Sequence, residues 1–261
     1  MHNASNLKPG ASPVVISKRD TSVTSNEENR KSRVVVEMGT ETEPILVRWS
    51  TMWGRYSPFE SYGLSTKDGW VIIDPEAPDA QGKERLRGLI PEHPIATVLT
   101  SDGHERSCYE VREKWGIPVW GPEPRSDPST RPIAYDGEPD HFYKTGQTLP
   151  GGLIPIKLQG SWGGDHAVLW DAPDGQKILF SGDILNGQVE LSLAQADHYR
   201  LEPGLYFGSR PGYIDRHQDH EALKQSLRDL LQEDFDVICG AHGTPFSDNP
   251  KEAIIRLIDS I

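Results

Sequence analysis

The chain has 261 residues, of which 35% are hydrophobic and 25% are charged, and it contains 25 glycines and 21 prolines. These values are typical of a soluble globular protein with one large domain, and they exclude collagen-like and low-complexity chains. Acidic side chains outnumber basic ones by 39 to 27, which gives a net charge of -12. This charge repels phosphate backbones and anionic lipid surfaces, so we expect neither nucleic acid nor a membrane as a partner.

The two cysteines, Cys108 and Cys239, each lie in an apolar stretch, which argues against a disulfide framework and favours a reducing compartment. Residues 1–33 are rich in Ser, Asn, Thr and Lys and show no helical or strand period, so they are predicted to form a flexible tail. Their longest apolar run is too short for a secretion signal. We therefore expect a cytoplasmic protein whose folded domain spans residues 34–261.

The folded part opens with β-branched segments that predict strands over 33–38 and 45–50. Residues 61–74 indicate a hairpin that turns at Asp68-Gly69. Helical and strand patterns then alternate, as in a βαβ unit. The expected elements are a helix over 79–90, a strand over 96–100, a helix over 105–115 and a strand over 118–120.

A connection with five prolines, residues 122–140, separates this half from a second set of strands. The expected strands cover 142–148, 152–158, 167–170 and 177–180 and form a second meander. A helix over 219–231 and a strand over 235–239 follow. Asn249-Pro250 then starts a final helix, with the Asn side chain expected to cap it and Pro in its first turn. Two blocks of strands, each followed by helices, predict two packed sheets with helices outside, a four-layer αβ/βα sandwich.

Three polar clusters follow the ends of predicted strands, where α/β proteins usually bind their ligands. They are residues 100–106, 181–183 and 240–245, and a fourth polar segment, residues 163–166, leads into a strand. Their positions predict that they meet at one end of the sheets.

These segments, in this order, resemble the metallo-β-lactamase superfamily over roughly residues 45–261. The resemblance is based on a hairpin ending in Ile73-Asp74-Pro75, a strand ending in Thr100, and the later segments Gly163-Gly164-Asp165-His166, Ser181-Gly182-Asp183 and Gly240-Ala241-His242-Gly243. It implies the four-layer fold and the hydrolysis of an ester, thioester, amide or lactone by metal-activated water.

The family's first motif reads His, any residue, His, any residue, Asp, His, and it supplies four zinc ligands. Here those positions hold Ser101, Gly103, Glu105 and Arg106, so only Glu105 remains a candidate ligand. The later family ligands match His166, Asp183 and His242. The resemblance therefore implies a reduced site for one divalent metal, with zinc expected and iron or manganese as alternatives, and no nucleotide cofactor.

Other interpretations of the same residues stay open. With a one-residue shift, Asp102 and His104 would join His166 as a three-ligand site. Arg106 would instead pair with Asp183 or Glu105 and replace a metal's charge, which favours a non-catalytic protein that binds a small molecule or a partner in the cleft. A third scheme is metal-free, with His104 or His242 as a general base. Asp183, His104 and Arg106 are accordingly the candidate catalytic residues.

Each candidate also has a purely structural explanation. Glu105 can be a first-turn carboxylate of a helix capped by Asp102, and Asp183 can be a turn residue that binds backbone amides. Trp53 and Trp162 lie in predicted loops that, in this fold, would border the site. They suggest that a small-molecule substrate carries an apolar or aromatic group.

Overall fold

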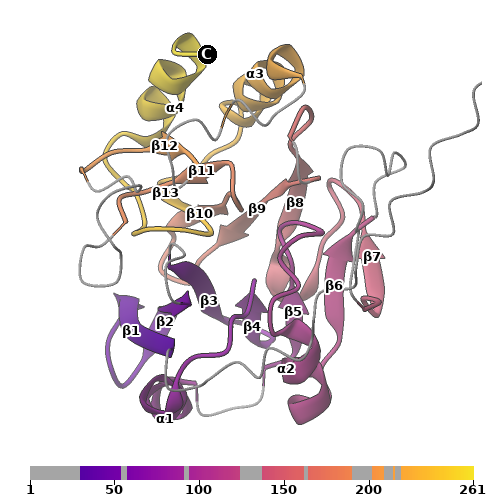
Figure 1. Ribbon diagram of the computed structural model, residues 1–261, viewed down its shortest axis with the longest axis vertical. Coiled ribbons are helices and arrows are strands. Elements are labelled where there is room, and N and C mark those ends of the chain that lie inside the picture. Colours follow the sequence, from indigo (N-terminus) through magenta and orange to yellow (C-terminus); the bar gives the residue numbers. More distant parts are fainter. Residues whose placement is uncertain are drawn as a thin grey trace, which may run out of the picture.

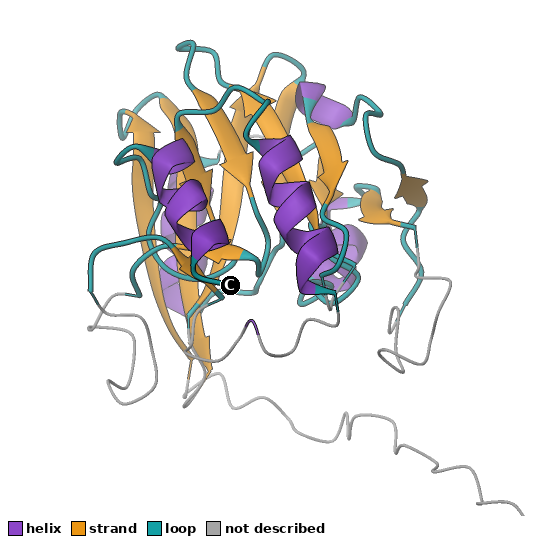
Figure 2. Cartoon of the chain, turned by 90° about the horizontal axis from the view of Figure 1, so that it is seen from above, coloured by secondary structure: helices purple, strands orange, loops and turns teal. Residues whose placement is uncertain are grey.

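The computed structural model describes residues 30–53, 58–90, 94–123, 137–161, 164–189, 202–208, 214 and 219–261. Two sheets pack face to face, with one pair of helices outside each of them (Figure 1). Figure 2, viewed from above, shows helices both in front of and behind the strands. The predicted four-layer αβ/βα sandwich is confirmed.

The first sheet has seven strands whose order in space follows the chain. They are β1 (Arg30–Gly39), β2 (Pro44–Trp53), β3 (Phe59–Thr66), β4 (Gly69–Ile73), β5 (Ala96–Val98), β6 (Val119–Pro122) and β7 (His141–Tyr143). Strands β1 to β4 are antiparallel, and β4 to β7 are parallel. The β3–β4 hairpin turns at Lys67-Asp68, as the Asp-Gly pattern predicts.

Helices α1 (Ala80–Leu89) and α2 (Cys108–Trp115) cover the outer face of this sheet. The side chain of Asp79 accepts a hydrogen bond from the amide of Gly82 at 2.7 Å and so starts α1. Gly116 ends α2 in the left-handed conformation, with φ 66°. Leu89 of α1 and Cys108 of α2 are buried against the sheet, as their positions on the apolar helix faces predict.

The second sheet has four strands in the order β13-β10-β9-β8. These are β8 (Ile154–Lys157), β9 (His166–Asp171), β10 (Lys177–Phe180) and β13 (Val237–Cys239), and a 3₁₀ turn, Pro150–Gly152, precedes them. A separate two-stranded ribbon consists of β11 (Leu185–Asn186) and β12 (Tyr206–Phe207). Helices α3 (His220–Leu230) and α4 (Pro250–Asp259) cover the outer face, where Leu223, Leu227 and Leu230 are fully buried.

Two sequence-based expectations are wrong. Strand β7 pairs in parallel with β6 and so belongs to the first sheet, not to the second meander. Parallel pairing requires a long crossover, and the proline-containing connection provides its length. Asn249 does not cap α4 with its side chain; it takes the left-handed conformation, with φ 50°, which Asn tolerates better than most residues.

The main core lies between the sheets, where inward-facing residues of both interdigitate. It includes Leu46, Tyr62, Leu64, Ile73, Val168, Trp170, Ile178 and Phe180. The hydroxyl of Tyr62 donates to the carbonyl of Gly240 at 2.7 Å and so joins the first sheet to the loop after β13. Within the described parts of the chain, no helix is long and apolar enough to cross a bilayer.

Candidate active site

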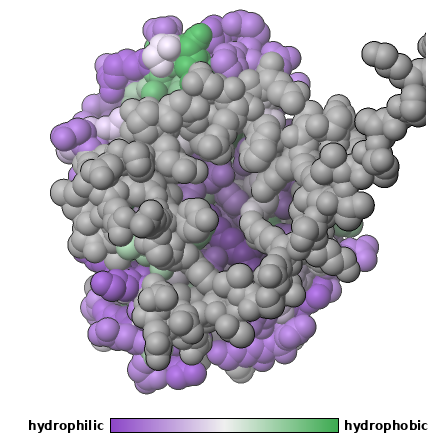
Figure 3. Space-filling view, in the orientation of Figure 1, coloured by the Kyte–Doolittle hydropathy of each residue, from purple (hydrophilic) through white to green (hydrophobic). Residues whose placement is uncertain are grey.

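The predicted polar clusters do meet at one end of the sheets. Asp74 follows β4, Thr100 follows β5, Asp183 follows β10 and His242 follows β13, so each comes just after the carboxyl end of a parallel strand. Figure 3 shows that the described residues visible near the middle of the face seen in Figure 1 are hydrophilic. This end of the sandwich is the candidate site.

Asp74 organises the first-sheet side of the site. It takes the left-handed conformation, with φ 45°, directly after β4, and its carboxylate accepts from the amide of Thr100 at 2.8 Å. The second carboxylate oxygen contacts the hydroxyl of Thr100 and lies 2.9 Å from Nδ1 of His104. Burial opposes ionisation of Asp74, but His104, Arg106 and Thr100 outweigh it and lower its pKa.

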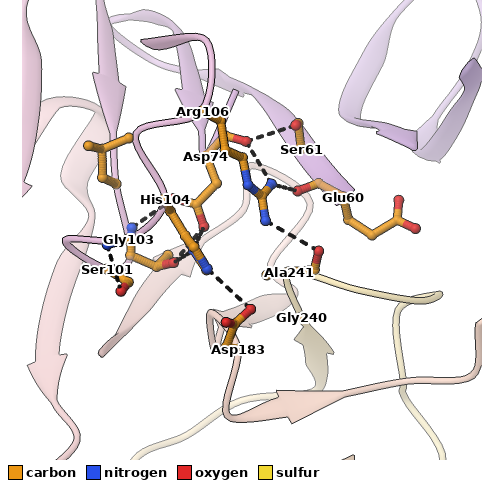
Figure 4. A network of polar contacts seen from close by, with 12 residues as sticks. Glu60, Ser61, Asp74, Ser101, Gly103, His104, Arg106, Asp183, Gly240 and Ala241 are labelled. Atoms are coloured by element: carbon orange, nitrogen blue, oxygen red, sulfur yellow. Dashed lines mark hydrogen bonds and ion pairs between the residues drawn. The ribbon is translucent and has the colours of Figure 1, made fainter. Parts of the chain in front are cut away.

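His104 lies between two carboxylates, as Figure 4 shows. Its Nδ1 faces Asp74, and its Nε2 lies 3.1 Å from Oδ1 of Asp183. Burial favours the neutral imidazole, but the two carboxylates prevail and raise the pKa of His104 to about 10. Without another cation, the imidazole is therefore protonated at neutral pH.

His242 approaches the same oxygen of Asp183 from the second sheet. Its Nε2 lies 3.2 Å from Oδ1 of Asp183, and its Nδ1 lies 2.7 Å from the carbonyl of Pro58. A carbonyl only accepts, so Nδ1 of His242 must carry a proton. The side chain of Asp183 is 29% exposed, whereas those of His104 and His242 are 7% and 11% exposed. Oδ1 itself is buried, so the exposure of Asp183 comes from the rest of its side chain.

Asn186 fixes the backbone of both second-sheet residues, a role the sequence did not reveal. Its side-chain nitrogen donates to the carbonyl of Asp183 at 2.7 Å, and its oxygen accepts from the amide of His242 at 2.8 Å. Gly182, with φ 56°, lets the turn approach Thr100, because a Cβ there would lie 3.0 Å from the Thr100 hydroxyl. Asp74 was also missed as a site residue, although a carboxylate directly after a buried strand is a usable signal.

Arg106 does not form the predicted pair with Asp183 or Glu105 as its main contact. Its guanidinium donates to the carbonyls of Glu60 at 2.6 Å, Asp74 at 3.0 Å and Ala241 at 3.5 Å (Figure 4). It also lies over the ring of Phe59, 4.9 Å from its centroid. The backbone of Arg106 is left-handed, with φ 42°, which turns the side chain toward these carbonyls. Arg106 thus joins the loops of the two sheets.

A further buried carboxylate, Asp165, adds negative charge beside the cluster. It is 1% exposed, and its Oδ2 has no hydrogen-bond donor among the described residues. Burial, followed by the charge of Asp183, raises its pKa to about 6, with a smaller contribution from Asp102. An unpartnered buried oxygen is costly unless a proton or a cation compensates it.

For two of the predicted metal ligands, His166 and Glu105, the structure shows contacts away from the Asp183 carboxylate; the Nδ1 contact of His166, like that of His242, leaves its Nε2 available. Nδ1 of His166 contacts the carbonyl of Gly164 at 3.0 Å, and its ring packs edge-on against Tyr143. Burial first, and then Lys157, lower the pKa of His166 to about 4. Glu105 accepts from the hydroxyl of Tyr109 at 2.6 Å and from the amide of Gly137 at 3.2 Å. The prediction that Trp53 lies in a loop is wrong, because Trp53 is the last residue of β2 and pairs with Arg30 of β1. Its side chain and Trp162 lie outside the described residues.

The contacts of the cluster require positive charge. Nδ1 of His104 and Nδ1 of His242 both face acceptors, so each neutral imidazole would point an Nε2 lone pair at the carboxylate of Asp183. Such acceptor-to-acceptor contacts require positive charge, supplied either by protons or by a metal ion. Metal-binding histidines typically hold their other nitrogen on a carboxylate or carbonyl in this way.

Among the described residues, no three or more His, Cys, Asp and Glu side chains are already spaced as a finished metal centre. A cation would therefore require the side chains around Asp183 to adjust. A second ion does not fit the first-sheet loop, because Ser101 and Gly103 stand where the family pattern has histidines.

No family model and no curated protein matches the sequence. Solved structures do match. A metallo-β-lactamase from Pontibacter korlensis has 16% identity and a TM-score of 0.59, over 88% of this chain and 98% of that chain. Metallo-β-lactamase IND-7 has 15% identity and a TM-score of 0.57 over 87% and 98%, and DIM-1, exposed to ceftazidime, has 13% and 0.58 over 88% and 97%. The chain therefore has the metallo-β-lactamase fold.

Proposed function

We propose that the protein is a hydrolase that binds one divalent cation at Asp183, His104 and His242 and cleaves an ester, thioester, amide or lactone. The observation that carries this proposal is the approach of two imidazole Nε2 atoms, at 3.1 and 3.2 Å, to one carboxylate oxygen of Asp183. Zinc is the expected ion, because it accepts mixed imidazole and carboxylate ligands and leaves a position open for catalysis.

A bound divalent cation supplies two functions in hydrolysis: it lowers the pKa of a water molecule, and it polarises the carbonyl oxygen of the substrate. The protein's own residues prepare the site. Asp74 and the carbonyl of Pro58 fix the orientation of His104 and His242, because each accepts the Nδ1 proton. Arg106 holds the loops that carry these groups, so it is a positioning residue in this proposal.

The substrate is a small molecule. Its apolar or aromatic group would contact Trp53, which precedes the first site segment in the sequence, and Trp162, which lies between the segments that carry His104 and Asp183. The negative charge of the chain argues against nucleic acid. Both cysteines are buried and free, as is usual in the cytoplasm, where we place the protein.

The test combines metal content with turnover. Protein purified without chelator is analysed for zinc, iron and manganese and assayed on an ester, a thioester, a lactone and a β-lactam. We expect about one metal ion per chain, and activity that falls at least 100-fold in Asp183→Ala together with the loss of the ion. His141→Ala, a histidine that stacks on Trp120, is the matched control and should keep both.

A second candidate is a metal-free binding protein, which the double carboxylate contact of His104 and the fixed charge of Arg106 favour. In that case protons alone supply the positive charge. Three results together would establish this candidate and refute the hydrolase. The purified protein would contain no metal, its thermal stability would be the same with and without added zinc, and it would hydrolyse none of the four substrates.

A further inference from the structure

Asp165 is a buried carboxylate to which the proposed function assigns no role. It is 1% exposed, and its Oδ2 has no hydrogen-bond donor among the described residues. An ionised carboxylate in such a place lowers the stability of the fold, because its lost hydration is not replaced by donors or by a cation. A rule of folding that is broken in this way usually marks a functional site.

The main chain around Asp165 is fixed on both sides. Its amide donates to the hydroxyl of Ser161 at 3.0 Å, and its carbonyl accepts from the amide of Leu158 at 2.9 Å. The amide of the next residue, His166, donates to the carbonyl of Thr100 at 2.8 Å. The main chain therefore cannot carry the carboxylate to solvent unless these hydrogen bonds break.

The carboxylate of Asp165 lies against the turn that carries Asp183. A Cβ on Gly182, the residue before Asp183, would lie 3.7 Å from Oδ1 of Asp165. The charge of Asp183 repels the ionised Asp165, and that of Asp102 adds to this repulsion. His104 attracts it. Neighbouring carboxylates that the fold holds together in this way attract a cation placed between or beside them.

We propose that Asp165 strengthens cation binding through its charge, acting through Asp183 without being a ligand itself. This inference rests on the proposed function, because the ion is the one held by Asp183, His104 and His242. In the metal-free protein, Asp165 and Asp183 repel each other. A divalent cation at Asp183 attracts both carboxylates, so relief of this repulsion contributes to the affinity of the site.

This role predicts two effects of opposite sign when the charge is removed. The metal-free protein becomes more stable, because no charge is left buried at this position and the repulsion from Asp183 is gone. The affinity for the cation falls, because one of the attracting charges is lost. A residue that only supported the fold would lower the stability of the metal-free protein when replaced.

Asp165→Asn tests both effects in the full chain, because it keeps the shape of the side chain and removes its charge. Competition with a chromogenic chelator measures zinc affinity, and thermal unfolding in excess chelator measures the metal-free protein, both at neutral pH. We expect the zinc affinity to fall about ten-fold and the unfolding midpoint to rise by about 2–4 °C. Asp165→Ala, which introduces no amide, should lose the same affinity. Asp171→Asn, at an exposed position that ends the same strand, β9, should change neither.

The possible failures are distinguishable. Unchanged zinc affinity in both Asp165 variants would overturn the inference and leave the proposed function intact. A metal-free Asp165→Asn protein less stable than the unaltered chain would also overturn it, because Asp165 would then serve the fold. If the unaltered chain binds no zinc, the proposed function and the inference fail together.

Discussion

The two sheets contribute to the candidate site in different ways. The second sheet supplies Asp183 and His242 directly after β10 and β13, at the positions that the family resemblance implies. The first sheet supplies His104, held by Asp74, in a loop whose sequence differs from the ligand pattern of the resemblance. The second-sheet side of the site thus matches the pattern of the resemblance, and the first-sheet side holds different residues. Changing each side in turn tests whether both serve one ion.

The largest effect on metal affinity is expected from a change at Asp74, on the first-sheet side of the site. Asp74→Asn would remove the carboxylate that fixes His104 and should weaken metal binding by about 10–100-fold, as is typical for groups that orient a metal ligand. Competition with a chromogenic zinc chelator measures this affinity. The exposed Asp171→Asn is the control and should have no effect. If Asp74→Asn kept full affinity, His104 would not be a ligand oriented by Asp74.

The next prediction concerns the stability of the protein and Arg106, which joins the loops of the two sheets. Arg106→Met would leave the carbonyls of Glu60 and Asp74 without their donor, which should lower the free energy of unfolding by about 1–3 kcal/mol. Urea unfolding of the metal-free protein measures it, with Arg112→Met as the control. A stable Arg106→Met protein that had lost its ion would instead indicate a direct role at the metal.

Asp165 gives a pH-dependent test with an effect of similar size. Its pKa is raised from 3.8 to about 6, so the folded state holds the proton more tightly than the unfolded state does. In chelator, the unaltered chain should therefore lose about 1–3 kcal/mol of stability relative to Asp165→Asn as the pH rises from 4 to 7. Urea unfolding across this range measures the difference. A constant difference between the two proteins would mean that Asp165 is not perturbed.

Much of the fold could be predicted because its signals are local. The Asp68-Gly69 turn and the apolar faces of α1 and α3 each depend on residues a few positions apart, and all are found in the structure. The sheet to which β7 belongs was not predictable in this way, because pairing across the long connection depends on residues far apart in sequence.

The positions of site residues could be predicted only where the side chain lies within a few residues of the end of its strand. Asp183 and His242 satisfy that condition. In the loop after β5, the left-handed backbone of Arg106 directs its side chain to carbonyls, and Glu105 turns toward Tyr109. Asn186 acts through backbone groups of residues distant in sequence, for which no sequence motif exists. His166 matches the family pattern only by its place in the order of motifs along the sequence. In the structure its ring contacts the carbonyl of Gly164 and packs against Tyr143.

The central claim is that His104 and His242, one from each sheet, share a cation with Asp183. The most direct test is the metal content after dialysis against equimolar zinc. It is measured for the unaltered chain and for three variants, His104→Ala, His242→Ala and His166→Ala. We predict about one zinc ion in the unaltered chain and in His166→Ala, and almost none in the other two variants. Zinc retained in both His104→Ala and His242→Ala, or lost only in His166→Ala, would contradict the account.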